Sequence, residues 1–216
     1  MRTIRRNDAE RAVPARVLNE IEVLSAPLGS QIVTGATICP VQNTRRQPHV
    51  LHLGVFTSSG ALVPETVDDR HHGTHLYKAA DLSIYPSIED APEPEVIYAG
   101  VFFSHYGHFL LESLARLWYA KDHPELPIVW IGVDSWGLSP QLREWQREIL
   151  DVLGVRNPTR VLTRASRFAT VHVPDAGYKY ADWCHPQQMS FLAAYDATEQ
   201  VPGRKVWLSR TQVENG

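Results

Sequence analysis

The sequence predicts an α/β fold built on a largely parallel sheet, with antiparallel strands added at its N-terminal side. Three observations lead to this fold class. Strand-like and helix-like segments alternate in the second half, the run PIVWIGVD is continuously apolar, and the first third contains only strand-like segments. Alternating strands and helices are typical of parallel sheets with helices on both faces, and a continuously apolar strand is typical of a sheet buried on both sides.

The first half of the chain is expected to supply strands and connecting loops. Residues 1–30 are charged and then mixed, and we expect a flexible arm with one strand there. The segments QIVTGATICPV, HVLHLGVFT and EVIYAGVF are rich in β-branched residues and lie near Pro and Gly, so strands are predicted at 31–41, 49–57 and 95–102. A hairpin turn and a polar, histidine-bearing loop lie between the last two.

The second half is expected to alternate helices and strands. For the helix in SPQLREWQREILDVLGV, Ser139 suits the N-cap, Pro140 the first helical position and Gly154 the C-terminal stop. In chain order we predict a helix at 107–119, a strand at 127–134, and then the helix in SPQLREWQREILDVLGV. Short strands in RVLTR and FATVHVPD follow, then a loop GYKYADWCHP, a helix at 186–198 and a strand at 205–210.

Composition restricts the class of protein. The chain has 216 residues, 44% of them apolar, and a formal net charge of −3, so we expect a folded protein that does not bind nucleic acid. Cys39 and Cys184 lie far apart and form no CxxC pair, which favours a thiol-reducing compartment. The basic N-terminus has no apolar run behind it, and no segment reaches the ~18 apolar residues of a membrane span. We therefore expect a cytoplasmic protein.

The segment SHYGHFLLESLARLW carries the main functional signal. Its helix is almost entirely apolar apart from His108, Glu112 and Arg116, which are spaced four apart and share one face. His105 lies one turn earlier, in the loop that follows a predicted strand. Two interpretations are open: the stripe is the solvated edge of a helix with a Glu112–Arg116 ion pair, or it faces a cleft at the carboxyl end of the strand, where His or Glu takes a proton from a hydroxyl group.

The same segment resembles the glycosyltransferase family 61 pattern. That pattern begins with an aromatic residue or Asn, followed by Gly or Tyr and then by His. The next positions hold Trp or Phe, two Leu residues, and Asp or Glu. Two or three residues later come an apolar residue, Pro or Ala, Arg and Leu. YGHFLLESLARLW is similar to it, and KVWLSR is similar to the strand ending in Ser-Arg that this family shows later. The order of the elements between the two motifs also agrees, so the resemblance covers residues 95–210.

The resemblance implies an inverting glycosyltransferase of capsular or surface polysaccharide biosynthesis with a GT-B fold. We expect residues 31–203 to form the acceptor-side domain and residues 204–216 to begin a donor-binding domain, because two such domains need roughly 300 residues. The implied partners are a nucleotide-sugar donor and a saccharide acceptor, and a lipid-linked acceptor would bring the protein to a membrane surface. No metal or other cofactor is expected, and the oligomeric state is open.

The resemblance also implies roles for individual residues. His108 and Glu112 are the expected bases, with His108 preferred because imidazole titrates near neutral pH, and Arg116 would orient Glu112 or contact ligand. The expected substrate-binding residues are His105 and Tyr106 beside the stripe, Ser209 and Arg210 at the end of KVWLSR, and, apart from the resemblance, Trp183 in the aromatic and cationic loop GYKYADWCHP. An Arg at the end of the KVWLSR strand would hold phosphate oxygens through two hydrogen bonds.

Two other classes of function remain open. The first is a saccharide-binding or interaction module without catalysis. The second is a metal-dependent hydrolase that uses the run RHHGTH, in which His71 and His75 have i,i+4 spacing and His72 lies between them. Gly73 interrupts that run and no Glu accompanies it, so a solvated loop is the competing interpretation.

Overall fold

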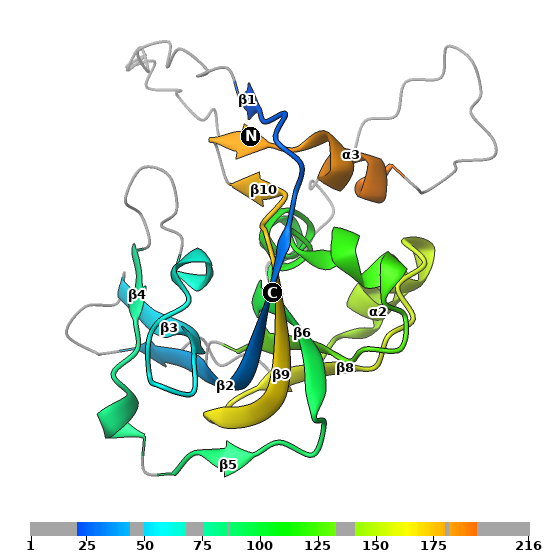
Figure 1. The fold of residues 1–216 in the computed structure, drawn as a ribbon. Helices are drawn as coiled ribbons and strands as arrows, with labels where there is room; N and C mark the ends of the chain where they lie inside the picture. Colours follow the sequence, from blue (N-terminus) through cyan, green and yellow to red (C-terminus); the bar gives the residue numbers. More distant parts are fainter. Residues whose placement is uncertain are drawn as a thin grey trace, which may run out of the picture.

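A mixed sheet forms the centre of the molecule (Figure 1). The computed structural model describes residues 21–43, 50–67, 76–85, 87–132, 141–179 and 182–193. The main sheet has the strand order β4-β3-β2-β9-β6-β7-β8, with β5 beside β9. Its strands are β2 (Ser30–Asn43), β3 (Val50–Phe56), β4 (Leu76–Ala79), β5 (Glu89–Asp90), β6 (Glu95–Val101), β7 (Ile128–Ile131), β8 (Thr159–Leu162) and β9 (Ser166–Pro174).

Strand directions divide the sheet at β2. Strands β9, β6, β7 and β8 run parallel to one another, and β3 pairs in parallel with β4. Strand β2 lies between these groups and is antiparallel to both β3 and β9. The α/β class is therefore confirmed, and the sheet is mixed. The expected antiparallel strand enters the middle of the sheet rather than adding to one edge.

The two faces of the sheet are covered differently. One buried cluster includes Ile97, Ile128 and Trp130 from the strands and Phe109, Leu150 and Phe191 from the helices. The other joins Ile38 and Leu53 to Tyr98 and Phe168, and within the described residues its members include none from α1, α2 or α3. The backbone N–H of Val41, late in β2, donates to the carbonyl oxygen of Gly132, just after β7, at 3.4 Å. The sheet therefore curves back on itself, and the expected helices on both faces are replaced by helices on one face.

A second, small sheet lies above the main one in Figure 1. Strand β11 (Trp183–Cys184) is its central strand, parallel to β1 (Glu22–Val23) and antiparallel to β10 (Tyr178–Lys179). The segment GYKYADWCHP, expected to be a loop, thus contains two strands. That expectation was wrong because residues 22–23, far away in sequence, provide the pairing partner, and local propensity does not show such a partner.

The regular helices are short. They are α1 (Tyr106–His108), α2 (Glu144–Val152) and α3 (Pro186–Leu192), with 3-10 turns η1 (Pro64–Thr66), η3 (Leu82–Ile84) and η5 (Leu117–Asp122) and a π-helical turn η4 (Phe109–Ser113). At the start of α2, Oε1 of Gln146 accepts from the backbone N–H of Arg143 at 2.8 Å. After its end, Gly154 has φ = 74°, as the predicted stop requires. The helix begins at Glu144 with Arg143 at its N-cap, later than the start predicted from Ser139 and Pro140. Ser139, Pro140 and the strand expected at 205–210 lie outside the described residues.

The helix expected over residues 107–119 is interrupted, and tertiary hydrogen bonds explain why. The carbonyl oxygen of Ser113 accepts from the indole N–H of Trp130 at 2.8 Å, and that of Leu114 accepts from Nε2 of Gln188 at 3.1 Å. The carbonyl oxygen of Ala115 accepts from the N–H of Gly177 at 2.7 Å. These consecutive carbonyls thus bond to other elements, and the chain changes to π and then 3-10 geometry around them. Such π turns are frequent at functional sites.

Candidate functional site

A pocket opens beside the carboxyl-terminal half of β6, where the chain enters η4. Its free volume is about 590 Å³, including the open mouth. The lining side chains that carry charge or a hydroxyl group are Thr66, Tyr77, Tyr98, Glu112, Arg116, Tyr178 and Lys179. We call it the Glu112 pocket. Its place agrees with the rule that ligands of α/β proteins bind outside the carboxyl ends of the sheet strands.

His108 and Glu112 form a hydrogen-bonded pair at this pocket. Nδ1 of His108 lies 2.6 Å from Oε1 of Glu112, so the ring N–H donates to the carboxylate. The Glu112 side chain is 12% exposed and the His108 side chain 38% exposed. Only Glu112 of the two lines the pocket. The geometry therefore favours Glu112 as the group that meets a ligand and His108 as the group that orients it, which reverses the preference based on sequence.

Two hydrogen bonds of the buried Ser113 hydroxyl group fix the turn that carries this pair. Oγ of Ser113 donates to the carbonyl oxygen of Val101 at 2.9 Å and accepts from the N–H of Phe103 at 2.9 Å. The hydroxyl group therefore ties the π turn directly to the end of β6. The ring of Phe103 lies 5.5 Å from that of His108, so the same strand end also packs against the imidazole.

Arg116 is buried, and its guanidinium connects separate parts of the chain. Its side chain donates to the carbonyl oxygen of Pro174 at the end of β9 and, at 2.5 Å, to that of Glu65 in η1. Its guanidinium carbon lies 5.7 Å from the centre of the Tyr98 ring. Arg116 lines the pocket together with Glu112, as the shared stripe predicts, but the residue is only 7% exposed. It is therefore a wall of the site and not part of a solvated helix edge.

Tyr98 and Gly100, both in β6, form the inner side of the pocket. Burial raises the pKa of Tyr98 to about 12, partly offset by the positive charge of Arg116. Its phenol is therefore neutral at physiological pH and can donate a hydrogen bond. Gly100 has φ = 85°, and a Cβ at this position would lie 3.7 Å from Nε of Arg116. The glycine thus allows a backbone conformation that other residues rarely adopt, right beside the guanidinium.

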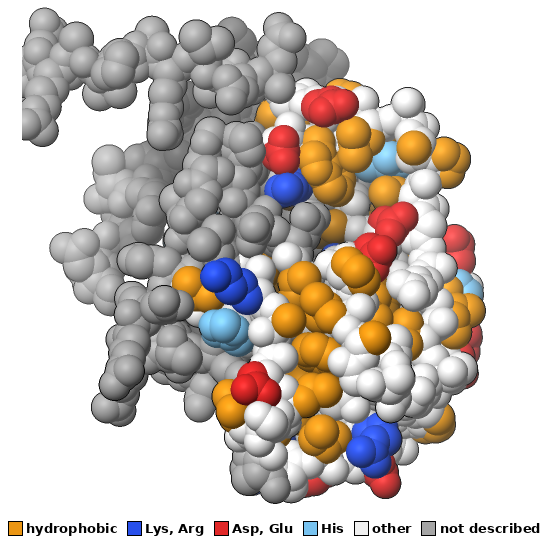
Figure 2. Space-filling model, turned by 60° about the vertical axis from the view of Figure 1, so that its left-hand side comes forward, with side chains coloured by type: hydrophobic (Ala, Val, Ile, Leu, Met, Phe, Trp, Pro, Cys, Tyr) orange, Lys and Arg blue, Asp and Glu red, His pale blue; other side chains and the backbone are white. Residues whose placement is uncertain are grey.

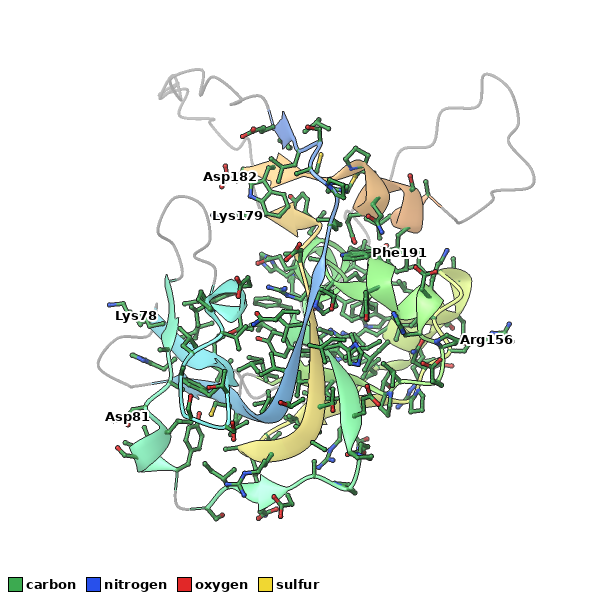
Figure 3. The ribbon with its side chains drawn as sticks, viewed as in Figure 1. Lys78, Asp81, Arg156, Lys179, Asp182 and Phe191 are labelled. Carbon is green, nitrogen blue, oxygen red and sulfur yellow. The ribbon has the colours of Figure 1, made fainter. Side chains whose placement is uncertain are left out.

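The hairpin of β10 and β11 brings a second cation to the pocket. Nζ of Lys179 lies 3.3 Å from Oδ2 of Asp182, and Figure 3 shows both residues at the small sheet, away from Lys78 on β4. Lys179 and Arg116 line the same pocket as the carboxylate of Glu112 and bring positive charge to it. A carboxylate base beside fixed cations suits a reaction in which a hydroxyl loses a proton and an anionic group departs.

The other predicted residues are distributed as follows. The ring of His105 lies 5.2 Å from that of His108 and so belongs to the same site. Tyr106 is 61% exposed, and its ring faces Trp145 at 5.4 Å, in an apolar groove between η4 and α2. Trp183 lines a neighbouring pocket. The residues Ser209, Arg210, His71, His72 and His75 lie outside the described residues.

Sequence reasoning did not select several residues of the Glu112 pocket. Tyr77 and Tyr98 come from strands whose side chains alternate between faces, so no local pattern shows that they meet. Lys179 was expected only as part of the loop GYKYADWCHP. Gly100 carried the available signal, because an isolated glycine in a strand often marks a close approach of another group.

Two absences concern only the part of the chain that the structure describes. There, no group of three or more His, Cys, Asp or Glu side chains is placed to hold a metal ion. There too, no helix has the length and apolar character that crossing a membrane requires.

Comparison with protein-family models, with curated proteins and with solved structures finds no match to this chain.

Proposed function

We propose that this chain is the acceptor-binding side of an inverting glycosyltransferase with a GT-B arrangement. In the proposed reaction a saccharide hydroxyl attacks the anomeric carbon of a nucleotide-sugar. The new C–O bond forms as the bond to the diphosphate breaks, the nucleoside diphosphate leaves with the electron pair, and Glu112 receives the hydroxyl proton. The observation that carries the proposal is the His108–Glu112 pair on a pocket that also contains Arg116 and Lys179.

The proposal gives each residue a part in this reaction. His108 holds the carboxylate of Glu112 toward one orientation through the 2.6 Å hydrogen bond. Lys179 places positive charge at the pocket, and Arg116, anchored by two carbonyl groups, keeps its charge at a fixed position. Preorganised cations of this kind stabilise negative charge that develops on a leaving group. Ser209 and Arg210 remain the proposed phosphate contacts of the resemblance.

The resemblance to family 61 gives the proposal its substrate class. A nucleotide-sugar is the donor, a saccharide of a capsular or surface polysaccharide is the acceptor, and a lipid-linked acceptor would place the reaction at a membrane surface. The alternative is a saccharide-binding module that does not catalyse transfer. It is favoured by Trp183, which lines a neighbouring pocket that does not include Glu112.

The test is transfer by the full-length gene product. Purified protein is incubated with a panel of UDP-, GDP- and dTDP-sugars and neutral saccharide acceptors, and products are followed by mass spectrometry and by proton NMR of the anomeric signal. The proposal requires a product whose anomeric configuration is opposite to that of the donor. Retention of configuration contradicts the in-line mechanism. Saccharide binding without transfer to any acceptor supports the non-catalytic alternative.

A further inference from the structure

A second pocket shares a wall with the Glu112 pocket. Both are lined by Arg116 and Ala176, and the second is also lined by Trp183, Glu65 and Asp175. Its cavity volume is about 440 Å³, which is within the range of sites that bind small molecules. We call it the Trp183 pocket. The proposed function leaves it without a role, although it lies directly beside the proposed reaction site.

The Trp183 side chain differs from those of the two buried tryptophans, Trp118 and Trp130. The indole N–H groups of Trp118 and Trp130 donate to backbone carbonyls at 2.9 and 2.8 Å, as buried indoles usually do. Trp183 is only half-buried, and within the described residues its indole N–H has no hydrogen-bond partner. Its ring therefore offers both an apolar face and a donor to a ligand in the pocket.

The backbone of Trp183 is fixed although its side chain is half-exposed. Strand β11 is paired on both sides, with Glu22 opposite Trp183 on β1 and Lys179 opposite it on β10. Residues directly opposite each other in an antiparallel pair point to the same face. Lys179 and Trp183 therefore lie on the same face of the hairpin, where Lys179 lines the Glu112 pocket and Trp183 lines the neighbouring pocket.

Apart from Arg116 and the indole N–H of Trp183, the polar side chains that line the Trp183 pocket are carboxylates. Oδ2 of Asp175 accepts from the backbone N–H of Gly29 at 2.7 Å, which fixes the position of this carboxylate. Glu65 is exposed and lines the same pocket. On the face of the molecule that Figure 2 shows, acidic side chains lie among hydrophobic ones in the upper half. Carboxylates accept hydrogen bonds from hydroxyl groups and repel anions, so polyhydroxylated ligands without negative charge fit this pocket.

Arg116 does not reverse this preference. Its side chain donates to the carbonyl oxygens of Pro174 and Glu65, so it joins the end of β9 to η1 and stands between the two pockets. A ligand that occupies both pockets must pass over Arg116 and Ala176. A chain of linked sugar rings has the length and the hydroxyl groups to do so, while its ring faces can cover the indole.

We propose that the Trp183 pocket is a subsite for a second, uncharged sugar ring of the acceptor. The acceptor is then an oligosaccharide that spans Arg116, with its reactive hydroxyl at Glu112 and the next ring on Trp183. This inference rests on the proposed function for the identity of the first site. The aromatic face, the fixed carboxylate of Asp175 and the shared wall carry the second site independently.

The test compares binding across ligand length. Glucose, cellobiose and cellotriose, and N-acetylglucosamine, chitobiose and chitotriose, are titrated by calorimetry into the full-length wild-type protein, Trp183→Ala and Trp145→Ala. Trp145 is the matched control because it is also a partly buried tryptophan but lines the apolar groove at α2. We expect at least tenfold tighter binding of a trimer than of its monomer in the wild type and in Trp145→Ala, and loss of that gain in Trp183→Ala.

Two further variants keep the result interpretable. Trp183→Phe retains an aromatic face within β11 and is expected to keep most of the gain, and Glu65→Gln changes an exposed side chain and is expected to reduce it about threefold. Equal affinity for monomer and trimer, an undiminished gain in Trp183→Ala, or no binding of any of the six sugars overturns the subsite.

Failure of the subsite and failure of the proposed function give different results. In Glu112→Gln the length dependence of binding is expected to persist while transfer is lost. Length-dependent binding without transfer in the wild type contradicts the transferase and leaves the subsite in place. Transfer with no dependence on acceptor length contradicts the subsite alone.

Discussion

Nδ1 of His108 lies 2.6 Å from Oε1 of Glu112, one helical turn further along the same irregular helix. The two side chains differ in exposure, since that of Glu112 is nearly buried and lines the pocket while that of His108 is more than a third exposed. This contact decides which of the two side chains acts on the ligand in the proposed reaction. The carboxylate meets the ligand, and the imidazole orients the carboxylate from behind.

His108→Ala should reduce transfer without abolishing it. The carboxylate remains, but it loses the donor that orients it, so we expect kcat to fall about tenfold to a hundredfold with little change in KM for either substrate. His108→Asn should restore part of the activity, because its amide N–H can still donate to Glu112. Steady-state kinetics of both variants check this, and equal losses in the two would argue against an orienting hydrogen bond.

Arg116→Met should destabilise the protein strongly. The substitution removes a buried cation that donates to the carbonyl oxygens of Pro174 and Glu65, and leaves these groups without that donor. We expect a loss of about 2–4 kcal/mol in the free energy of unfolding. Arg116→Lys should cost less, because one ammonium group can still reach one carbonyl. Urea denaturation measures both, and an unchanged midpoint in Arg116→Met would contradict the anchoring role.

Trp130→Phe tests the cause of the helix interruption. The phenyl ring keeps most of the buried apolar contact, but the carbonyl oxygen of Ser113 loses the indole N–H that lies 2.8 Å away. We expect a loss of about 1–3 kcal/mol in the free energy of unfolding. We also expect faster amide hydrogen exchange in residues 109–117, measured by mass spectrometry. Unchanged exchange there would mean that this hydrogen bond does not set the local geometry.

Alkaline pH should destabilise the protein through two buried acids. Burial raises the pKa of the Cys39 thiol from 9.0 to about 12 and that of Tyr98 from 10.0 to about 12. Above about pH 9 the unfolded chain therefore loses these protons before the folded chain does. The free energy of unfolding then falls as pH rises, by about 2–3 kcal/mol from Cys39 alone between about pH 9 and pH 11.

Cysteine variants separate this effect from general alkaline damage. Cys39→Ala should show a shallower decline in the free energy of unfolding over the same pH range, whatever its stability at neutral pH. Cys184→Ala is the control, because Cys184 is only half-buried. Parallel declines in the two variants would contradict a buried, protonated Cys39.

The sequence supported the α/β class and most strands, because hydrophobic runs and β-branched residues show them locally. The expected strands at 31–41, 49–57 and 95–102 correspond to β2, β3 and β6. It could not show that β2 enters the middle of the sheet, or that β11 pairs with β1, since both depend on contacts between distant segments. The regular helix at 107–119 was wrong for the same reason: its carbonyls bond to Trp130, Gly177 and Gln188, far away in sequence.

The candidate site was predictable only along its own helix. Spacing of four placed Glu112 and Arg116 on one face, and both do line one pocket. The residues that complete the pocket, Tyr77, Tyr98 and Lys179, come from three separate strands. Nothing in their local sequence indicates that they meet, so the pocket's composition required the fold.

The most direct test of the central claim is transfer by Glu112→Gln in the full-length protein, with Glu125→Gln as the matched control. Glu125 also contacts a histidine, His123, at 3.9 Å, but on the exposed surface away from the pocket. We predict that kcat of Glu112→Gln falls at least a hundredfold while the affinity for saccharide changes less than about threefold, and that Glu125→Gln behaves as the wild type. Normal turnover by Glu112→Gln would contradict the account.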